Sequence, residues 1–229
     1  MSHISAGQLS AFSQASMRTS SQDLLSIQPG WVVGLVGRPG HGLTRLGLSM
    51  LAPTARRALV AAVDVRGWLS PLAAWENGIE PEQLVMVRCP DRHQWLGVAA
   101  ALLEGLPAIY AEVPTGIRDQ DLRRLASLAR ACQARLVLRP LNGDLPDGVT
   151  HLRLQATYST WGGVERGHGR LVNRRMELEA SGKGAAGMVR RLIVEDDGSS
   201  LRVEEGNDGA DSLRMVSRLA PVSGGSAIG

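Results

Sequence analysis

Short apolar runs that alternate with helical stretches constrain the fold of this chain more than any other sequence feature. Each run has the length and the Val, Ile and Leu content of a strand buried on both faces. The stretches between the runs have helical spacing of their apolar residues. Such alternation predicts an α/β fold with a mostly parallel sheet flanked by helices. The strand runs are 31–36, 58–63, 84–87, 108–111 and 135–138, and the helical stretches are 42–51, 70–77, 93–104 and 118–132.

The sequence pattern changes after residue 147, where helical stretches are replaced by segments in which polar and apolar residues alternate. Strand-like segments at 150–156, 170–179, 188–195 and 200–204 predict antiparallel hairpin strands at one edge of the sheet. The glycine-rich segment 157–169 between the first two is predicted to be a loop. We divide the chain into an N-terminal arm, 1–28, weakly helical or disordered, one domain, 29–204, and a flexible C-terminal tail, 205–229.

Composition fits this division. A chain of 229 residues with 44% apolar and 21% charged residues can bury one globular core. The sequence has no apolar run near the ~18 residues of a membrane span and no apolar signal core, so we expect no membrane partner. Cys89 and Cys132 lack the spacing of metal ligands or of a redox pair, so we expect no metal site. The expected location is the cytoplasm, with association with the nucleoid left open.

The segment between the first strand and the first helix resembles a phosphate-binding loop, Gly-x4-Gly-Lys-Ser/Thr, except at the lysine. Leu43 stands at that position, and a leucine can neither hydrogen-bond a phosphate nor balance its charge. The only lysine of the chain, Lys183, lies in a distant glycine-flanked turn. We therefore expect neither ATP nor another cofactor. The residues of this degenerate loop are Gly37, Gly40, Gly42, Leu43 and Thr44.

The stretch that follows resembles the core of the RecA recombinases. Four features keep that family's order and spacing: the strand ending at Asp64, the Leu-Ser-Pro71 segment, the segment 77–84 and the Pro90-Asp91 pair. The resemblance is specific over about 24–138 and looser to about 203, and it implies a RecA-like core.

The departures from the RecA pattern fall on nucleotide chemistry. The resemblance places Arg66 where the family has the glutamate that activates water, and an arginine cannot accept a proton. The aspartate that helps to hold magnesium is replaced, with Glu112 the nearest carboxylate. Together with Leu43, these changes predict that the chain is not an enzyme and has no catalytic residue.

Among RecA-like groups, the chain is similar to ImuA and to its actinobacterial form, ImuA-prime. This likeness implies an accessory protein of the SOS response, an adaptor in DNA repair by mutagenic translesion synthesis. The implied partner is an ImuB-like homologue of Y-family polymerases, and RecA and an error-prone replicative-type polymerase are left open as further partners. An alternative is an SOS cell-division inhibitor of the SulA kind that binds the division tubulin. A third, a nucleotide-dependent DNA motor, would require an arginine to replace the lost lysine.

Basic residues gather late in the chain, with eight between 151 and 191 against three acidic ones. Beside the aromatic residues of 157–169, they suggest a face that binds single-stranded DNA or a protein partner. The other interpretation is a solvated hairpin face. Trp68, Trp75 and Trp95 are expected to pack in the core, with partial exposure of one of them left open. The candidates for partner or DNA binding are Trp161, Arg166, Arg170, Arg174, Arg175, Lys183, Arg190 and Arg191.

Overall fold

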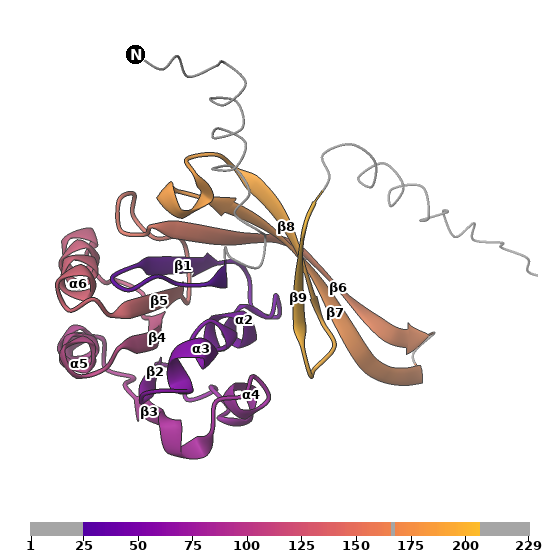
Figure 1. The fold of residues 1–229 in the computed structure, drawn as a ribbon, viewed down its shortest axis with the longest axis horizontal. Helices are drawn as coiled ribbons and strands as arrows, with labels where there is room; N and C mark the ends of the chain where they lie inside the picture. Colours follow the sequence, from indigo (N-terminus) through magenta and orange to yellow (C-terminus); the bar gives the residue numbers. More distant parts are fainter. Residues whose placement is uncertain (1–24, 166–167, 207–229) are drawn as a thin grey trace, which may run out of the picture.

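A computed structural model describes residues 25–165 and 168–206, which form a single nine-stranded sheet with the strand order β3-β2-β4-β5-β1-β6-β7-β8-β9 (Figure 1). The strands from β3 to β6 in this order run parallel, and β6 to β9 pair antiparallel. The predicted α/β class with C-terminal antiparallel strands is confirmed. The strands are β1 Val32–Val36, β2 Val60–Asp64, β3 Leu84–Arg88, β4 Ala108–Val113, β5 Arg135–Pro140, β6 Leu152–Glu165, β7 His168–Ser181, β8 Arg190–Asp196 and β9 Leu201–Glu205.

Helices cover both faces of the parallel part (Figure 1). On one face α5 and α6 share an apolar cluster that contains Trp95 and Leu125, and on the other α2, α3 and α4 share a cluster that contains Leu46 and Ala74. Within β1, Val32 belongs to the first cluster and its neighbour Val33 to the second, as the alternation of strand side chains requires. The helices are α2 Leu43–Ser49, α3 Ala52–Ala55, α4 Leu72–Trp75, α5 Arg92–Gly105 and α6 Asp119–Ala131, and the short 3-10 turns are η2 Pro81–Gln83 and η3 Lys183–Ala185.

The two long helices begin where local chemistry favours them. At the start of α5 the Asp91 carboxylate accepts a hydrogen bond from the His93 backbone N–H at 2.8 Å. The helix α6 has Asp119 and Asp121 in its first turn and Arg130 in its last, which complements the helix dipole at both ends. The helical stretch predicted at 42–51 is divided into α2 and α3, and α3 has a proline in its first turn.

The predicted loop at 157–169 is wrong. β6 and β7 remain paired out to Glu165 and His168, whereas β8 pairs with β7 only from Arg174 onward. The outer parts of these strands, 158–165 and 168–173, therefore form a two-stranded ribbon that projects from the sheet (Figure 1). The glycines that suggested a loop include Gly162 and Gly163, at a shift in register, and such β-bulges accept glycine within a strand.

The chain ends assigned to the arm and the tail lie mostly outside the described residues, at 1–24 and 207–229. In the part that is described, no helix has both the length and the apolar character needed to cross a membrane.

Candidate functional site

The degenerate loop connects β1 to α2 at the carboxyl ends of the parallel strands, where α/β proteins bind ligands. Leu43 is only 2% exposed and packs in the apolar core. A Cβ built on Gly37 would lie 2.9 Å from the Ala156 methyl group, 3.0 Å from Leu43 Cδ1 and 3.1 Å from His41 Nδ1. Side chains of this chain thus already pack beside Gly37, at the start of the loop.

The hydroxyl group that would hold magnesium in a working loop has a partner within the protein. The Tyr110 hydroxyl donates to Thr44 Oγ1 at 3.4 Å, and Tyr110 is fully buried. Burial raises the pKa of Tyr110 well above its usual value, so this hydroxyl keeps its proton at neutral pH. Burial also lowers the pKa of His41, and the charges of Arg38 and Arg139 lower it further, which favours a neutral imidazole.

An arginine from the other end of the chain lies on the loop. The Arg174 guanidinium, supplied by β7, occupies the position that a Cβ on Gly42 would take, and Gly42 has φ of 75°. Arg174 is 8% exposed, forms an ion pair with Asp196 of β8, and lies 4.9 Å above the ring of Trp161. A nucleotide-dependent DNA motor would require an arginine in place of the lost lysine, and Arg174 is a candidate for that arginine. Its charge is balanced by Asp196.

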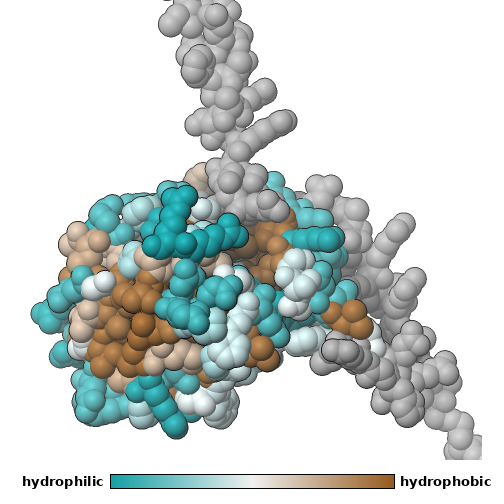
Figure 2. Space-filling view, turned by 60° about the horizontal axis from the view of Figure 1, so that its bottom comes forward, coloured by the Kyte–Doolittle hydropathy of each residue, from teal (hydrophilic) through white to brown (hydrophobic). Residues whose placement is uncertain are grey.

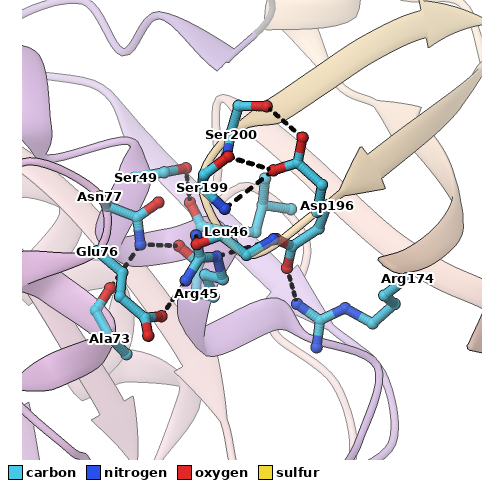
Figure 3. Close-up of polar contacts among 12 residues, drawn as sticks. Arg45, Leu46, Ser49, Ala73, Glu76, Asn77, Arg174, Asp196, Ser199 and Ser200 are labelled. Carbon is cyan, nitrogen blue, oxygen red and sulfur yellow. Dashed lines mark hydrogen bonds and ion pairs between the residues drawn. The ribbon is translucent and has the colours of Figure 1, made fainter. Parts of the chain in front are cut away.

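Asp196 binds a second arginine as well (Figure 3). Its Oδ1 lies 3.1 Å from Arg45 Nε, and Arg45 of α2 also forms an ion pair with Glu76 beyond the end of α4. This network is buried at Asp196 and Arg174 and exposed at Glu76. It connects α2, the end of α4, β7 and β8, and it balances two arginines with two carboxylates. The two arginines and the two carboxylates of the network are therefore bound to one another.

A second ion pair lies where β2 and β4 end. Arg66 binds Glu112, which is 1% exposed. Glu112 also accepts the backbone N–H groups of Val65, at 3.0 Å, and of Arg66, at 3.3 Å. On the neighbouring strand β5, Arg139 stands in register with Glu112 and donates to the Pro140 carbonyl oxygen at 2.9 Å. Burial lowers the pKa of Arg139 from its ordinary value.

The predicted basic cluster is not brought together. Arg174 pairs across the strands with Trp161, whereas Arg190 stands opposite Ala180, six residues further along β7, which is about 20 Å. Lys183 lies beyond the end of β7, in η3. Several of the candidates are also ion-paired: Arg174 with Asp196, Arg175 with Glu195 at 3.5 Å, and Arg190 with Glu205. Arg191 is exposed on β8, Arg170 is described by its backbone alone, and Arg166 lies outside the described residues.

The ribbon carries exposed apolar side chains instead. Tyr158 is 45% exposed, Trp161 49% and Val172 63%. Trp161 stands directly opposite Arg174, and Val172 shares the Arg174 face because it lies two residues away on β7. The face that is buried at Met176 thus continues outward beyond the core. Apolar surface of this kind is typical of a protein-binding site.

Two of the three tryptophans predicted in the core are exposed. Trp95 is buried as expected, but Trp68 is 76% exposed and Trp75 44%. The Asp64 carboxylate accepts the backbone N–H groups of Gly67 at 2.8 Å and of Trp68 at 3.3 Å, and this turn leaves the indole ring of Trp68 outside. An aspartate followed by a nearby glycine is a turn signal that could have identified this loop. Figure 2 shows exposed apolar areas between hydrophilic side chains on the lower side of the molecule.

Comparison with known protein families places part of the chain in a family. A family model described as the MT3502 N-terminal domain matches residues 24–144, more than half of the chain. The matched part contains β1 to β5 with α2 to α6 and ends before β6, so the ribbon lies outside it. No curated protein matches the chain.

Proposed function

The chain belongs to the MT3502 N-terminal domain family. We propose, from the likeness of its sequence to ImuA, that it is a non-catalytic, RecA-like accessory protein of damage-induced mutagenesis. In this proposal the protein acts in the cytoplasm, at the nucleoid, as an adaptor in translesion synthesis. Its partner is an ImuB-type homologue of the Y-family polymerases, as the likeness of the sequence to ImuA implies. The family match covers the helix-flanked parallel strands, and the partner-binding surface we propose lies beyond them.

The observation that carries the proposal is the Arg66–Glu112 ion pair. ATP hydrolysis in the RecA pattern needs a carboxylate to activate water and a second carboxylate for magnesium. Here Arg66 stands at the position of the carboxylate that activates water. Glu112, the carboxylate nearest to the magnesium position, is buried and paired with Arg66. An ion pair of this kind has neither a free base nor a free metal ligand, which argues against hydrolysis.

The degenerate loop supports the same conclusion. Leu43 contributes a methyl group near Gly37 and no charge. Arg38 within the loop is exposed, and Arg174, which packs on Gly42, is bound by Asp196. Using Arg174 in place of the lysine would require the protein to separate a buried ion pair, which is unfavourable.

We assign partner binding to the ribbon, with Trp161 as its anchor. Tryptophan is enriched among the residues that dominate binding energy at protein interfaces. Single-stranded DNA is the weaker candidate because Arg174 and Arg175 are paired with carboxylates, which reduces their attraction for phosphates.

Isothermal titration calorimetry with Mg-ATP tests the loss of nucleotide chemistry. We expect no saturable heat from the full chain. Micromolar affinity would contradict the proposal and would favour a nucleotide-dependent protein in which Arg174 replaces the lysine. The variant Arg174→Ala separates these two cases where circular dichroism shows that it is folded, because in a folded variant it abolishes binding only if Arg174 contacts the phosphates.

Capture of the ImuB-like protein tests the partner. We expect the full chain to retain it, and we expect Trp161→Ala to weaken capture by about tenfold or more, as the loss of an interface anchor does. The matched control is Trp68→Ala, an exposed tryptophan on the other half of the molecule. Equal loss in both variants, or no capture at all, would contradict the assignment. Binding to the division tubulin without capture of the ImuB-like protein would select the SulA-like alternative.

A further inference from the structure

A cleft of about 610 Å³ lies between the helices that follow β1 and β2 and the strand β9. None of the residues of the degenerate loop lines it, and it is independent of the proposed function. Its apolar lining comes from both halves of the sequence: Leu25, Met50, Pro53, Trp75, Leu201 and Val203.

Four polar side chains of the cleft, those of Ser49, Asn77, Ser199 and Ser200, already have hydrogen-bond partners within the protein. Asn77 donates to the Ala73 carbonyl oxygen at 2.6 Å, and Ser49 donates to the Leu46 carbonyl oxygen at 2.7 Å. The hydroxyl groups of Ser199 and Ser200, visible in Figure 3, both donate to Asp197. The cleft also exposes apolar surface to solvent, above all that of Trp75, which is 44% exposed. Its occupant should therefore present apolar side chains.

The chain itself enters at this cleft. Leu25 and Ser26 are part of its wall, so residues 1–24 are joined directly to it. A segment tethered at the rim has an effective concentration on the order of millimolar at the site, which favours it over a separate molecule. Its reach is ample, since 24 residues span up to about 80 Å when extended.

The composition of this segment suits the cleft. It contains Ile4, Leu9, Phe12, Met17 and Leu24, separated mainly by Ser, Ala and Gln, and Phe12 is the only phenylalanine of the chain. The segment contains one arginine, Arg18, and one aspartate, Asp23, so its apolar side chains and not its charge match it to the cleft.

We propose that residues 1–24 dock in this cleft of the same molecule, with their apolar side chains against Trp75. The docked segment contacts the α2–α4 side and β9 together. It therefore joins the part of the chain that matches the family model to the antiparallel strands outside it.

Hydrogen–deuterium exchange on the full chain tests the docking. We expect backbone amides within residues 4–24 to exchange about tenfold or more slowly than those of a free synthetic peptide of the same sequence, as docked segments do. Trp75→Ala should remove this protection. The matched control, Trp68→Ala, changes a tryptophan that does not line the cleft and should leave the protection unchanged.

Phe12→Ser gives a second variant that leaves the described fold untouched, and amides of β1 and β4 report folding in every sample. Exchange of residues 4–24 at the rate of the free peptide would overturn the proposal. Protection that survives both Trp75→Ala and Phe12→Ser would overturn the assigned cleft. Protection that is lost on about hundredfold dilution would overturn docking within one molecule, because binding between two copies depends on concentration.

Discussion

At the scale of single residues, Arg66 determines what the carboxylate of Glu112 does. Glu112 is nearly inaccessible, and an isolated buried carboxylate would be strongly unfavourable. Two backbone N–H groups and the guanidinium of Arg66 stabilise its charge. The pair therefore connects the ends of β2 and β4, and its role is to stabilise the fold.

We predict that Arg66→Ala lowers the free energy of unfolding by about 3 kcal/mol, because it leaves Glu112 buried without its cation. The matched control is Arg123→Ala, which removes an arginine whose side chain is 54% exposed from its pair with the 67% exposed Asp119 and should cost less than about 1 kcal/mol. Urea unfolding followed by circular dichroism measures both. Equal costs would show that the pair with Glu112 contributes no more than a surface pair.

His151 makes the stability of the protein sensitive to pH. Its Nδ1 accepts the backbone N–H of Val32 at 3.2 Å, and its ring stacks on Trp31. Burial lowers the pKa of His151 below its ordinary 6.5, and the charges of Arg130 and Lys183 lower it further. The unfolded chain therefore binds a proton at a higher pH than the folded chain does.

We predict that this contribution to stability is fully present above pH 6.5 and is lost as the pH falls through the lower folded pKa of His151. His41 contributes with the same sign. The urea midpoint should therefore fall between pH 7 and pH 5, and His151→Gln should flatten that fall without abolishing it. An unchanged pH profile in His151→Gln would contradict the assignment to this residue.

At the scale of secondary structure elements, the loop and the ribbon are connected through one contact. Gly42 begins α2, and the Arg174 guanidinium of β7 occupies the space that any side chain at Gly42 would need. Gly40, two residues earlier, also has a positive φ of 87° but has open space around it. These two glycines separate the effect of backbone conformation from that of the arginine.

We predict that Gly40→Ala costs about 1 kcal/mol, the strain of a left-handed backbone. Gly42→Ala should cost about 3 kcal/mol more, since it also displaces Arg174 from its buried pair with Asp196. Unfolding in urea measures the difference. Equal costs would indicate that Arg174 moves aside without penalty.

The strands β1 to β5 could be predicted from sequence because strands inside a helix-covered parallel sheet are continuous apolar runs. The ribbon could not, because Gly162, Gly163 and Gly169 are as typical of a loop as of a bulged strand. The loop at Leu43 was identified by its spacing, but its contact with Arg174 joins residues that are far apart in the chain. Pairing of the basic residues with Asp196, Glu195 and Glu205 likewise depends on strand register, which no local pattern determines.

At the scale of the whole molecule, the part that matches the family model and the antiparallel strands share one sheet through the pairing of β1 with β6. A second connection is the Asp196 network, in which Arg45 comes from the matched part and Arg174 from β7. Because Asp196 is 5% exposed, its charge depends on both arginines, and their charges depend on it. The two parts should therefore unfold together.

We predict that Asp196→Asn lowers the free energy of unfolding by about 3 to 5 kcal/mol, since two buried arginines lose their shared carboxylate. It should also separate the two parts, so that amides of β8 and β9 exchange before those of β1 and β4 in hydrogen–deuterium exchange. The matched control, Glu195→Gln, removes the adjacent but exposed carboxylate that pairs with Arg175, and should cost less than about 1 kcal/mol. If all strands of Asp196→Asn still opened at the same free energy, the pairing of β1 with β6 alone would be sufficient to couple the two parts.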